Sequence, residues 1–371
     1  MGIYEELNVH TIINCSGKMT YLGSSVLSKE VGEAMVQAGG RYVSMDELMV
    51  RAGKKAAELC GSEDGMITCG ASSGIIAAVA GIITRGNPLL TEQIPHPDTR
   101  KRQIILQKGH VIDFGAPIRQ MIEVGGGIVR EVGTVNKTNP YHIEESIGEE
   151  TAAILYVQSH HAVQTDMVGL KEVTAIAASH GIPVIVDAAA EEDLRKYTAA
   201  GADLVIYSGA KALEGPTSGL VVGKHRYIEM CRAQSKGVCR SMKVGKENIA
   251  GLLKAMMLYE ERQKSRKYRW DDILKCLYDG LKGLSEIKTE ISPDSAGRAI
   301  SRLKITVNRE ACRITALELD ARLREGEPAV YARNHHADLG YIELDPRPMR
   351  LEDCGIVIDR IKEILKPERA E

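Results

Sequence analysis

Hydrophobic residues occur in short, continuous runs through the middle of the chain, and helix-like segments separate these runs. Residues 182–186 and 204–207 are two of them. A strand that is apolar without interruption is typical of a parallel sheet covered on both faces. From residue 127 onward, strand-like and helix-like segments alternate, which predicts β-α units with right-handed crossovers. The pattern therefore predicts a large α/β domain on a mostly parallel sheet.

Other segments before residue 250 have weaker patterns. Residues 48–61 have helical spacing and end at a glycine that suits a C-cap. Residues 66–86 predict a short strand, a turn of small residues and a strongly apolar helix. Residues 87–102, which contain three prolines, predict a surface loop. The basic residues 229–246 lack a clear period and are either a solvated loop or an anion contact that could lie across a dimer interface.

The last third of the chain predicts a smaller α/β domain, because it mixes helical spacing with short alternating strands. Residues 301–308 alternate as a half-exposed strand, and residues 351–365 form an amphipathic helix. We expect three parts: an N-terminal segment 1–40 that packs on the small domain, a large domain 41–250, and a small domain 251–371.

Composition narrows the class of protein. The 371 residues include 44% apolar but only 4% aromatic residues, with one Trp and one Phe, so the core must be aliphatic. The net charge of −2 gives no indication of a basic surface that would bind nucleic acid. Eight scattered cysteines show no metal-binding spacing, and neither a signal-peptide pattern nor a membrane-spanning run is present. We expect a cytoplasmic protein without a metal.

Three reactive side chains follow the two apolar runs. Asp187 follows the first, and Ser208 and Lys211 follow the second. Ligands of open α/β sheets bind at the carboxyl ends of the strands, where these side chains would gather. A lysine that binds the cofactor covalently and a carboxylate beside its ring nitrogen suit pyridoxal phosphate (PLP). The alternative is an aspartate that caps a helix and a lysine in a surface loop.

A small-residue turn is the candidate for the cofactor phosphate. It comprises Gly70, Ala71, Ser72, Ser73 and Gly74, at the predicted N-terminus of the apolar helix. Free N–H groups and hydroxyls at a helix N-terminus bind anions. Plain capping of the helix by one of the two serines is the alternative.

Histidines and basic residues complete the candidate set. His110 follows the strand 104–106, where its ring could stack on the cofactor or transfer protons, although an isolated histidine is often structural. His160 and His161 follow another apolar strand; adjacent residues of an extended segment point apart, so we expect at most one of them to touch a ligand. The remaining candidates are anion contacts, with solvated loops or surface ion pairs as alternatives: Lys236, Arg240, Lys243 and Arg333.

The turn at 70–75 and the pair Tyr207 and Lys211 also imitate a short-chain dehydrogenase. The imitation fails, because Ile76 replaces the third glycine and Tyr207 ends a strand rather than lying on a helix. A nicotinamide enzyme is therefore not favoured.

Several segments, among them INCSGKMTYLG, SGAKALEGPTSG and EPAVYARN, resemble the selenocysteine-synthase-like branch of fold type I PLP enzymes, whose fold is that of aspartate aminotransferase. The resemblance implies that Lys211 binds PLP, that Asp187 faces the ring nitrogen, and that Ser72, Ser73 and Ser208 hold the phosphate. The extension with which selenocysteine synthases grip tRNA is absent from this chain, so we expect no nucleic-acid partner.

Within that branch, GASSGI, QKGHVIDFGAP and QSHHAVQ resemble the ammonia lyases of phosphorylated amino sugar acids. This implies loss of water and then of ammonia, with Lys211 as the base and His110, His160 or His161 as the acid. Arg333 would bind the substrate carboxylate and the basic stretch its phosphate, in a homodimer or larger homo-oligomer. Two alternatives stay open: another PLP reaction on an amino acid, such as a C–S β-lyase, and a non-catalytic PLP-fold protein.

Overall fold

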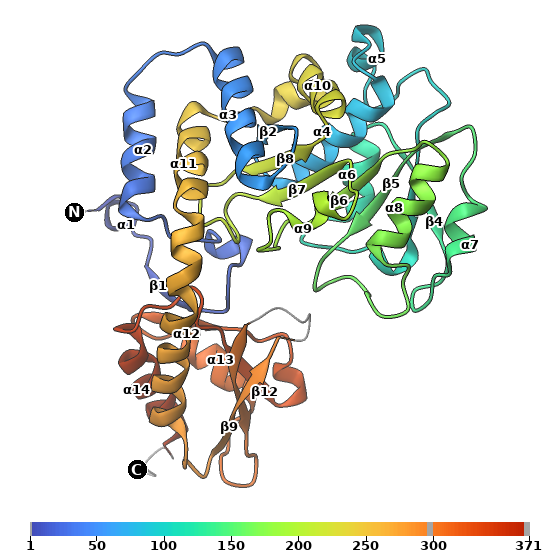
Figure 1. The fold of residues 1–371 in the computed structure, drawn as a ribbon. Helices are drawn as coiled ribbons and strands as arrows, with labels where there is room; N and C mark the ends of the chain where they lie inside the picture. The colour runs from blue at the N-terminus through green and yellow to red at the C-terminus, as the bar shows by residue number, and fades with distance from the viewer. Residues whose placement is uncertain (1, 295–299, 367–371) are drawn as a thin grey trace. The chain divides into compact units, whose positions relative to one another are not determined.

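A computed structural model describes residues 2–294 and 300–366, and the chain forms two compact units (Figure 1). The large unit is Leu27–Tyr259, and the small unit combines Met1–Val26 with Glu260–Glu371. The divisions expected after residues 40 and 250 remain a prediction about domains. None of the helices in the described part of the chain has the length and hydrophobicity of a membrane span.

A seven-stranded sheet forms the centre of the large unit, and all of its strands except β8 run parallel. A mostly parallel sheet was predicted; the antiparallel β8, in the glycine-rich GLVVG segment, was not. The order across the sheet is β2 (Asp64–Thr68), β8 (Gly219–Gly223), β7 (Leu204–Ser208), β6 (Val184–Asp187), β5 (Thr151–Val157), β3 (Gln103–Gln107) and β4 (Ile128–Val132).

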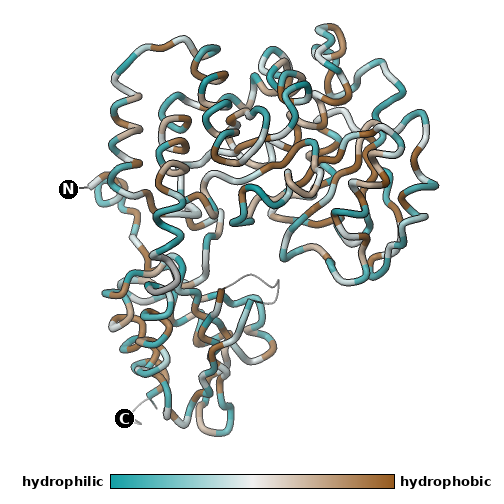
Figure 2. Tube along the Cα trace, in the orientation of Figure 1, coloured by the Kyte–Doolittle hydropathy of each residue, from teal (hydrophilic) through white to brown (hydrophobic). Residues whose placement is uncertain are grey.

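Helices cover both faces of this sheet, which explains why its strands are apolar without interruption. Along β7, Leu204 and Ile206 point into one core, whereas Val205 and Tyr207 point into the other. Figure 2 shows the hydrophobic strands between the layers. One core contains residues of α3 (Met45–Cys60), α8 (Leu170–Ser179) and α11 (Lys246–Met257), and the other contains residues of α4 (Ala71–Thr84), α6 (Ile118–Val124) and α10 (His225–Ala233).

Helices occur in both the predicted loop 87–102 and the basic stretch 229–246, which corrects the loop prediction for the first and the solvated-loop alternative for the second. Residues 87–102 include α5 (Pro88–Glu92), which Asn87 caps by accepting the Leu90 N–H at 3.1 Å. Residues 229–246 continue α10 and then form the 3-10 turns η3 (Gln234–Lys236) and η4 (Val238–Met242). The buried side chains of Cys231 and Cys239 anchor this basic segment to the core. Three further helices are α2 (Lys29–Gly39), which was not predicted, and the short α7 (Pro140–Glu144) and α9 (Lys196–Ala199).

The small unit contains two sheets and its own aliphatic core. In one sheet, β10 (Ser301–Val307) lies antiparallel between β9 (Ile287–Pro293), which was not predicted, and β12 (Tyr341–Leu344). In the other, β1 (Ile12–Cys15) pairs in parallel with β11 (Ala329–Ala332), so the two ends of the chain join one core. The helices of this part of the chain are α1 (Ile3–Glu6), α12 (Tyr259–Leu281), α13 (Ala316–Arg324) and α14 (Asp353–Leu365).

Candidate active site

The carboxyl ends of β5, β6 and β7 bring the predicted cofactor residues to one edge of the sheet. Asp187 ends β6 and pairs in register with Val157, the last residue of β5. Ser208 ends β7, and its N–H donates to the Ala189 carbonyl at 3.1 Å. Lys211 lies in the turn immediately beyond Ser208. The parallel strand order, rather than closeness in sequence, creates this cluster.

The Asp187 carboxyl is buried, and a positively charged partner would stabilise its ionised form. Its side chain is only 6% exposed, and Oδ1 accepts the Ala189 N–H at 3.1 Å. Burial raises the pKa of Asp187 to about 6, although the Ala189 N–H and the positive charge of Lys211 oppose the rise. A protonated ring nitrogen is a partner that would hold this carboxyl in its charged form.

The lysine turn requires small residues around Lys211. The Glu214 N–H donates to the Lys211 carbonyl at 3.1 Å, and Glu214 itself has a left-handed φ of 55°. A Cβ at Gly209 would lie 2.1 Å from the Ser218 hydroxyl, so only glycine fits there. This packing holds Lys211 half-buried beside the strand ends.

The small-residue turn lies beside Ser208. Gly219, the register partner of Ser208, packs so tightly that a Cβ would lie 2.4 Å from the carbonyl carbon and oxygen of Gly70. Ser73 caps α4: its hydroxyl accepts the Gly70 N–H at 3.0 Å and donates to the Gly70 carbonyl at 2.7 Å. The hydroxyl proton of Ser73 is therefore already used, whereas Ala71 and Ser72 remain partly exposed at the helix N-terminus.

His110 is completely buried at the same edge. Its Nδ1 accepts the Val157 N–H at 3.2 Å, and its ring meets Tyr156 edge to face with centroids 4.7 Å apart. Burial lowers the pKa of His110 to about 4. The Tyr156 hydroxyl donates to Gln164 at 3.2 Å. Tyr156 and Gln164 were not predicted as site residues, since Tyr156 reads as one more apolar position of β5.

The two adjacent histidines do not point apart. His160 and His161 lie in a turn after β5, and their ring centroids are 3.9 Å apart. The prediction of an extended segment that separates them was wrong, because the chain leaves the sheet at Val157 and the Ser159 hydroxyl accepts the His161 N–H at 3.2 Å.

The predicted anion contacts have different surroundings. Lys236, Arg240 and Lys243 are exposed on or beside the two 3-10 turns. Arg333 belongs to the small unit, where its Nε lies 3.3 Å from a Glu343 oxygen and both side chains are largely buried. Burial lowers the pKa of Arg333, and the positive charge of the neighbouring Arg302 lowers it further. Arg333 thus forms a partly buried ion pair rather than a surface one.

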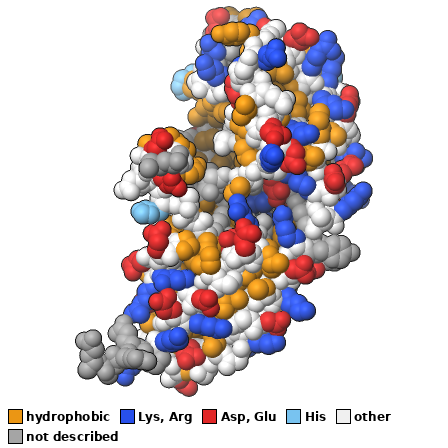
Figure 3. All heavy atoms as spheres, turned by 90° about the vertical axis from the view of Figure 1, so that its left-hand side faces the viewer, with side chains coloured by type: hydrophobic (Ala, Val, Ile, Leu, Met, Phe, Trp, Pro, Cys, Tyr) orange, Lys and Arg blue, Asp and Glu red, His pale blue; other side chains and the backbone are white. Residues whose placement is uncertain are grey.

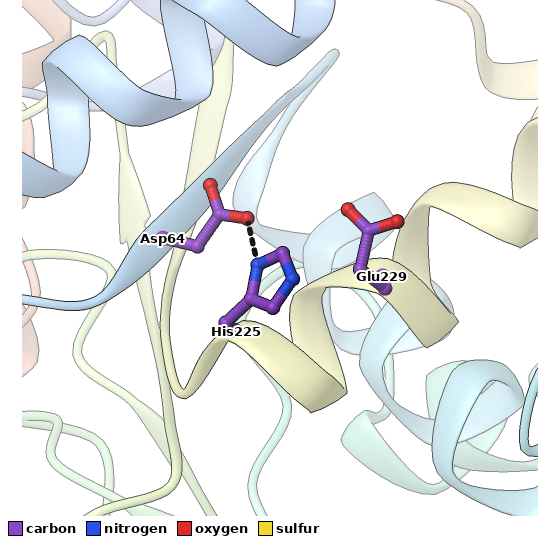
Figure 4. A group of neighbouring side chains, drawn as sticks. All are labelled: Asp64, His225 and Glu229. Carbon is purple, nitrogen blue, oxygen red and sulfur yellow. Dashed lines mark hydrogen bonds and ion pairs between the residues drawn. The ribbon is translucent and has the colours of Figure 1, made fainter.

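One other cluster has the residue types of a metal site: Asp64, His225 and Glu229, shown in Figure 4. The Asp64 carboxylate already has a cationic partner, because Arg232 donates to both of its oxygens at 2.7 and 2.8 Å, and His225 Nδ1 lies 2.8 Å from one of them. Arg232 also binds Glu229. The cluster therefore acts as a partly buried ion network between β2 and α10.

Comparison with known proteins identifies the family. Residues 12–319 match the family described as L-seryl-tRNA selenium transferase. The chain belongs to this family. It is 39% identical to D-glucosaminate-6-phosphate ammonia lyase of Salmonella typhimurium over 98% of both chains, and the solved structure of an enzyme of that name superposes with a TM-score of 0.91 at 38% identity and 98% coverage of both chains. The predicted resemblance is confirmed.

Two further similarities bear on the chemistry and the fold. The chain is 40% identical to a 5'-C-glycyluridine monooxygenase-decarboxylase of a Streptomyces species, over 98% of this chain and 92% of the relative. Aspartate aminotransferase from Thermus thermophilus shares the fold, with a TM-score of 0.53 at 15% identity over 97% of this chain and 93% of that chain. The predictions of a fold type I enzyme and of PLP as its cofactor are confirmed.

The residues at the sheet edge fit PLP. Asp187 offers a buried carboxyl for the ring nitrogen, and Lys211 is close enough to lower its pKa. The turn at Gly70 and the end of β7 lie together, where a phosphate group can reach N–H groups of α4 and the Ser208 hydroxyl. His110 adds a buried ring nitrogen that has no hydrogen-bond partner among the described residues.

Proposed function

We propose that this protein is an ammonia lyase that converts D-glucosaminate 6-phosphate to 2-keto-3-deoxy-6-phosphogluconate and ammonia. The observation that carries the proposal is the full-length similarity to a lyase with this substrate, together with a TM-score of 0.91. PLP, when bound, supplies an electron-accepting ring that makes the Cα proton of an amino acid acidic.

The side chains at the sheet edge have separate roles in the proposed reaction. The Lys211 amine would first hold the cofactor and then remove the Cα proton, a role that suits a half-buried lysine. Asp187 keeps the ring nitrogen protonated. Gly70, Ala71 and Ser72 offer N–H groups and a hydroxyl to the cofactor phosphate, together with Ser208, while Ser73 keeps the turn in shape by capping α4.

Departure of the C3 hydroxyl requires a proton. His160 and His161 are suited to supply it, because they stand at the carboxyl end of β5, next to Asp187 in the sheet, and at least His161 is exposed to solvent. We assign the substrate carboxylate to Arg333, which would exchange part of its pairing with Glu343 for a bidentate contact. The exposed Lys236, Arg240 and Lys243 are our candidates for the distal phosphate.

We also propose a homo-oligomer in the cytoplasm. All eight cysteines are free thiols, as expected in a reducing compartment. Hydrophobic side chains are exposed on and beside α2. Figure 3 shows the side of the molecule on which α2 lies in Figure 1, and hydrophobic side chains are visible there among the charged ones. The exposed residues of this segment are Val26, Val36, Tyr42 and Val43. Light scattering that gave the mass of a single chain at all concentrations would exclude the oligomer.

The function is tested by incubating the enzyme with D-glucosaminate 6-phosphate and measuring ammonia and 2-keto acid. Borohydride should fix the cofactor to Lys211. Lys211→Ala should lose both the bound-cofactor absorption and turnover, while Lys171→Ala, which alters an exposed lysine of α8, should keep both. A Lys211→Ala enzyme with full activity would contradict the mechanism.

A second candidate function is oxidative decarboxylation of an amino acid linked to a nucleoside, which the 40% identity to the monooxygenase-decarboxylase favours. The names of both relatives describe substrates with an amino acid group. One panel with the two substrates distinguishes the two functions. The lyase would release ammonia from the sugar acid without oxygen, whereas the alternative would consume oxygen and release carbon dioxide from 5'-C-glycyluridine. No product from the sugar acid would remove the lyase proposal and leave the PLP site untouched.

A further inference from the structure

The hydrogen bond between Val157 and His110 fixes the position of the imidazole proton. The backbone N–H of Val157 donates to Nδ1 at 3.2 Å, so Nδ1 must be unprotonated. A neutral imidazole carries one proton, and it must then reside on Nε2. Because the donor is a backbone N–H of a buried strand, it cannot become an acceptor, and the ring atom that it meets must carry a lone pair.

The surroundings of His110 also disfavour a second proton. Burial lowers its pKa to about 4, and Tyr156, which meets the ring edge to face, is itself a titratable side chain whose pKa burial raises. The groups that crowd the preceding Gly109 are uncharged: the Met167 sulfur, the Val163 side chain and the Val135 carbonyl. Protonation of Nδ1 would also break the bond to Val157.

The Nε2–H group is therefore a fixed donor, and it is buried without a hydrogen-bond partner among the described residues. A buried donor left unpaired costs roughly 1–3 kcal/mol, so such a group usually has a partner in the working molecule. The ring lies at the cofactor edge, because Val157 is the register partner of Asp187.

We propose that His110 is a permanently neutral hydrogen-bond donor that holds an acceptor atom of the bound cofactor or substrate through Nε2–H, and that it does not transfer the proton to the leaving hydroxyl. The identity of the acceptor rests on the proposed function, whereas the tautomer and the charge do not. His160 and His161 are then the histidines left for acid catalysis.

The charge and tautomer are tested by nitrogen-15 NMR of histidine-labelled holoenzyme between about pH 5.5 and about pH 8.5, a range that spans ordinary histidine titration. The His110 signals are assigned by their loss in His110→Gln or His110→Asn. We expect an Nε2-protonated ring that does not titrate in this range. An imidazolium forming near neutral pH, or a proton on Nδ1, would overturn the proposal. Should neither variant fold, the absence of any non-titrating Nε2–H histidine in the wild-type spectrum would overturn it equally.

The two variants also test the donor role, because the amide of each can replace one of the two ring nitrogens. The Asn amide can replace Nδ1 as the acceptor of the Val157 N–H but loses the donor, whereas the Gln amide can place an N–H near Nε2. We expect His110→Asn to weaken the binding of the cofactor or of the substrate about tenfold, as loss of one buried hydrogen bond does. His110→Gln should weaken the same binding less.

The source of the acceptor follows from which constant changes. A higher Kd for PLP assigns the acceptor to the cofactor, and a higher KM with unchanged Kd assigns it to the substrate. Unchanged values of both in His110→Asn would refute the donor role. Equal loss of kcat in both variants, with loss of one limb of the pH profile, would make His110 the acid after all.

Discussion

The burial of Asp187 should make the cofactor-free enzyme less stable as the pH rises. The pKa of this carboxyl rises from 3.8 to about 6 on folding, so the folded state binds its proton more tightly than the unfolded state. The resulting stabilisation is fully present below about pH 3.8 and is lost as the pH passes through about 6. Above that range, the folded protein carries the cost of a buried charge.

The size of the effect follows from the two pKa values. At about 1.4 kcal/mol for each tenfold change in proton affinity, the rise from 3.8 to about 6 corresponds to about 3 kcal/mol at neutral pH. Of this, more than about 1 kcal/mol develops between about pH 5 and about pH 7. Asp187→Asn removes the ionisable group, and its side-chain carbonyl can still accept the Ala189 N–H.

The assay is urea unfolding of the apoprotein at several pH values, with Asp98→Asn as a control because Asp98 is an exposed aspartate of the same unit. The advantage of Asp187→Asn over the wild type should grow with pH, and addition of PLP should reverse it, since the variant has no anion for the ring nitrogen. If both proteins lose stability in parallel across the pH range, burial does not perturb Asp187 and the reasoning fails.

Three further substitutions test contacts within the large unit, at the site and away from it. Gly219→Ala should destabilise the large unit by roughly 1–3 kcal/mol and weaken PLP retention, because its Cβ would lie 2.4 Å from the Gly70 carbonyl. Tyr207→Phe should cost about 1 kcal/mol through loss of its hydrogen bond to the loop after β6. Arg232→Met should cost about 3–5 kcal/mol, because it leaves the buried Asp64 carboxylate without its bidentate partner, and adding Asp64→Asn should recover much of that loss.

Matched substitutions separate these effects from general damage. Gly355→Ala places a Cβ where no atom lies within 4 Å, and Tyr141→Phe removes an exposed hydroxyl. Both should leave urea unfolding nearly unchanged or slightly improve it. A Gly219→Ala protein with normal stability and normal PLP retention would mean that the contact between β8 and the Gly70 turn is unimportant.

The sequence by itself determined the class of fold and the place of the chemistry. Continuous apolar runs are typical of strands that are buried on both faces, so the parallel sheet could be predicted from residues 182–186 and 204–207. Residues just after such runs must lie at the carboxyl edge, which predicted that Asp187, Ser208 and Lys211 would meet. The glycines near Lys211 pointed to the same edge.

Only the tertiary structure decided how the polar groups are used. Local pattern left open which of Ser72 and Ser73 caps the helix, and it cannot reveal that a backbone N–H from another strand fixes the His110 tautomer or that a turn brings the His160 and His161 rings together. The same holds for β8 and the basic segment after α10, whose places depend on partners far away in the chain. Apolar periodicity records burial one residue at a time, whereas hydrogen bonds and charges depend on which distant residue arrives beside them.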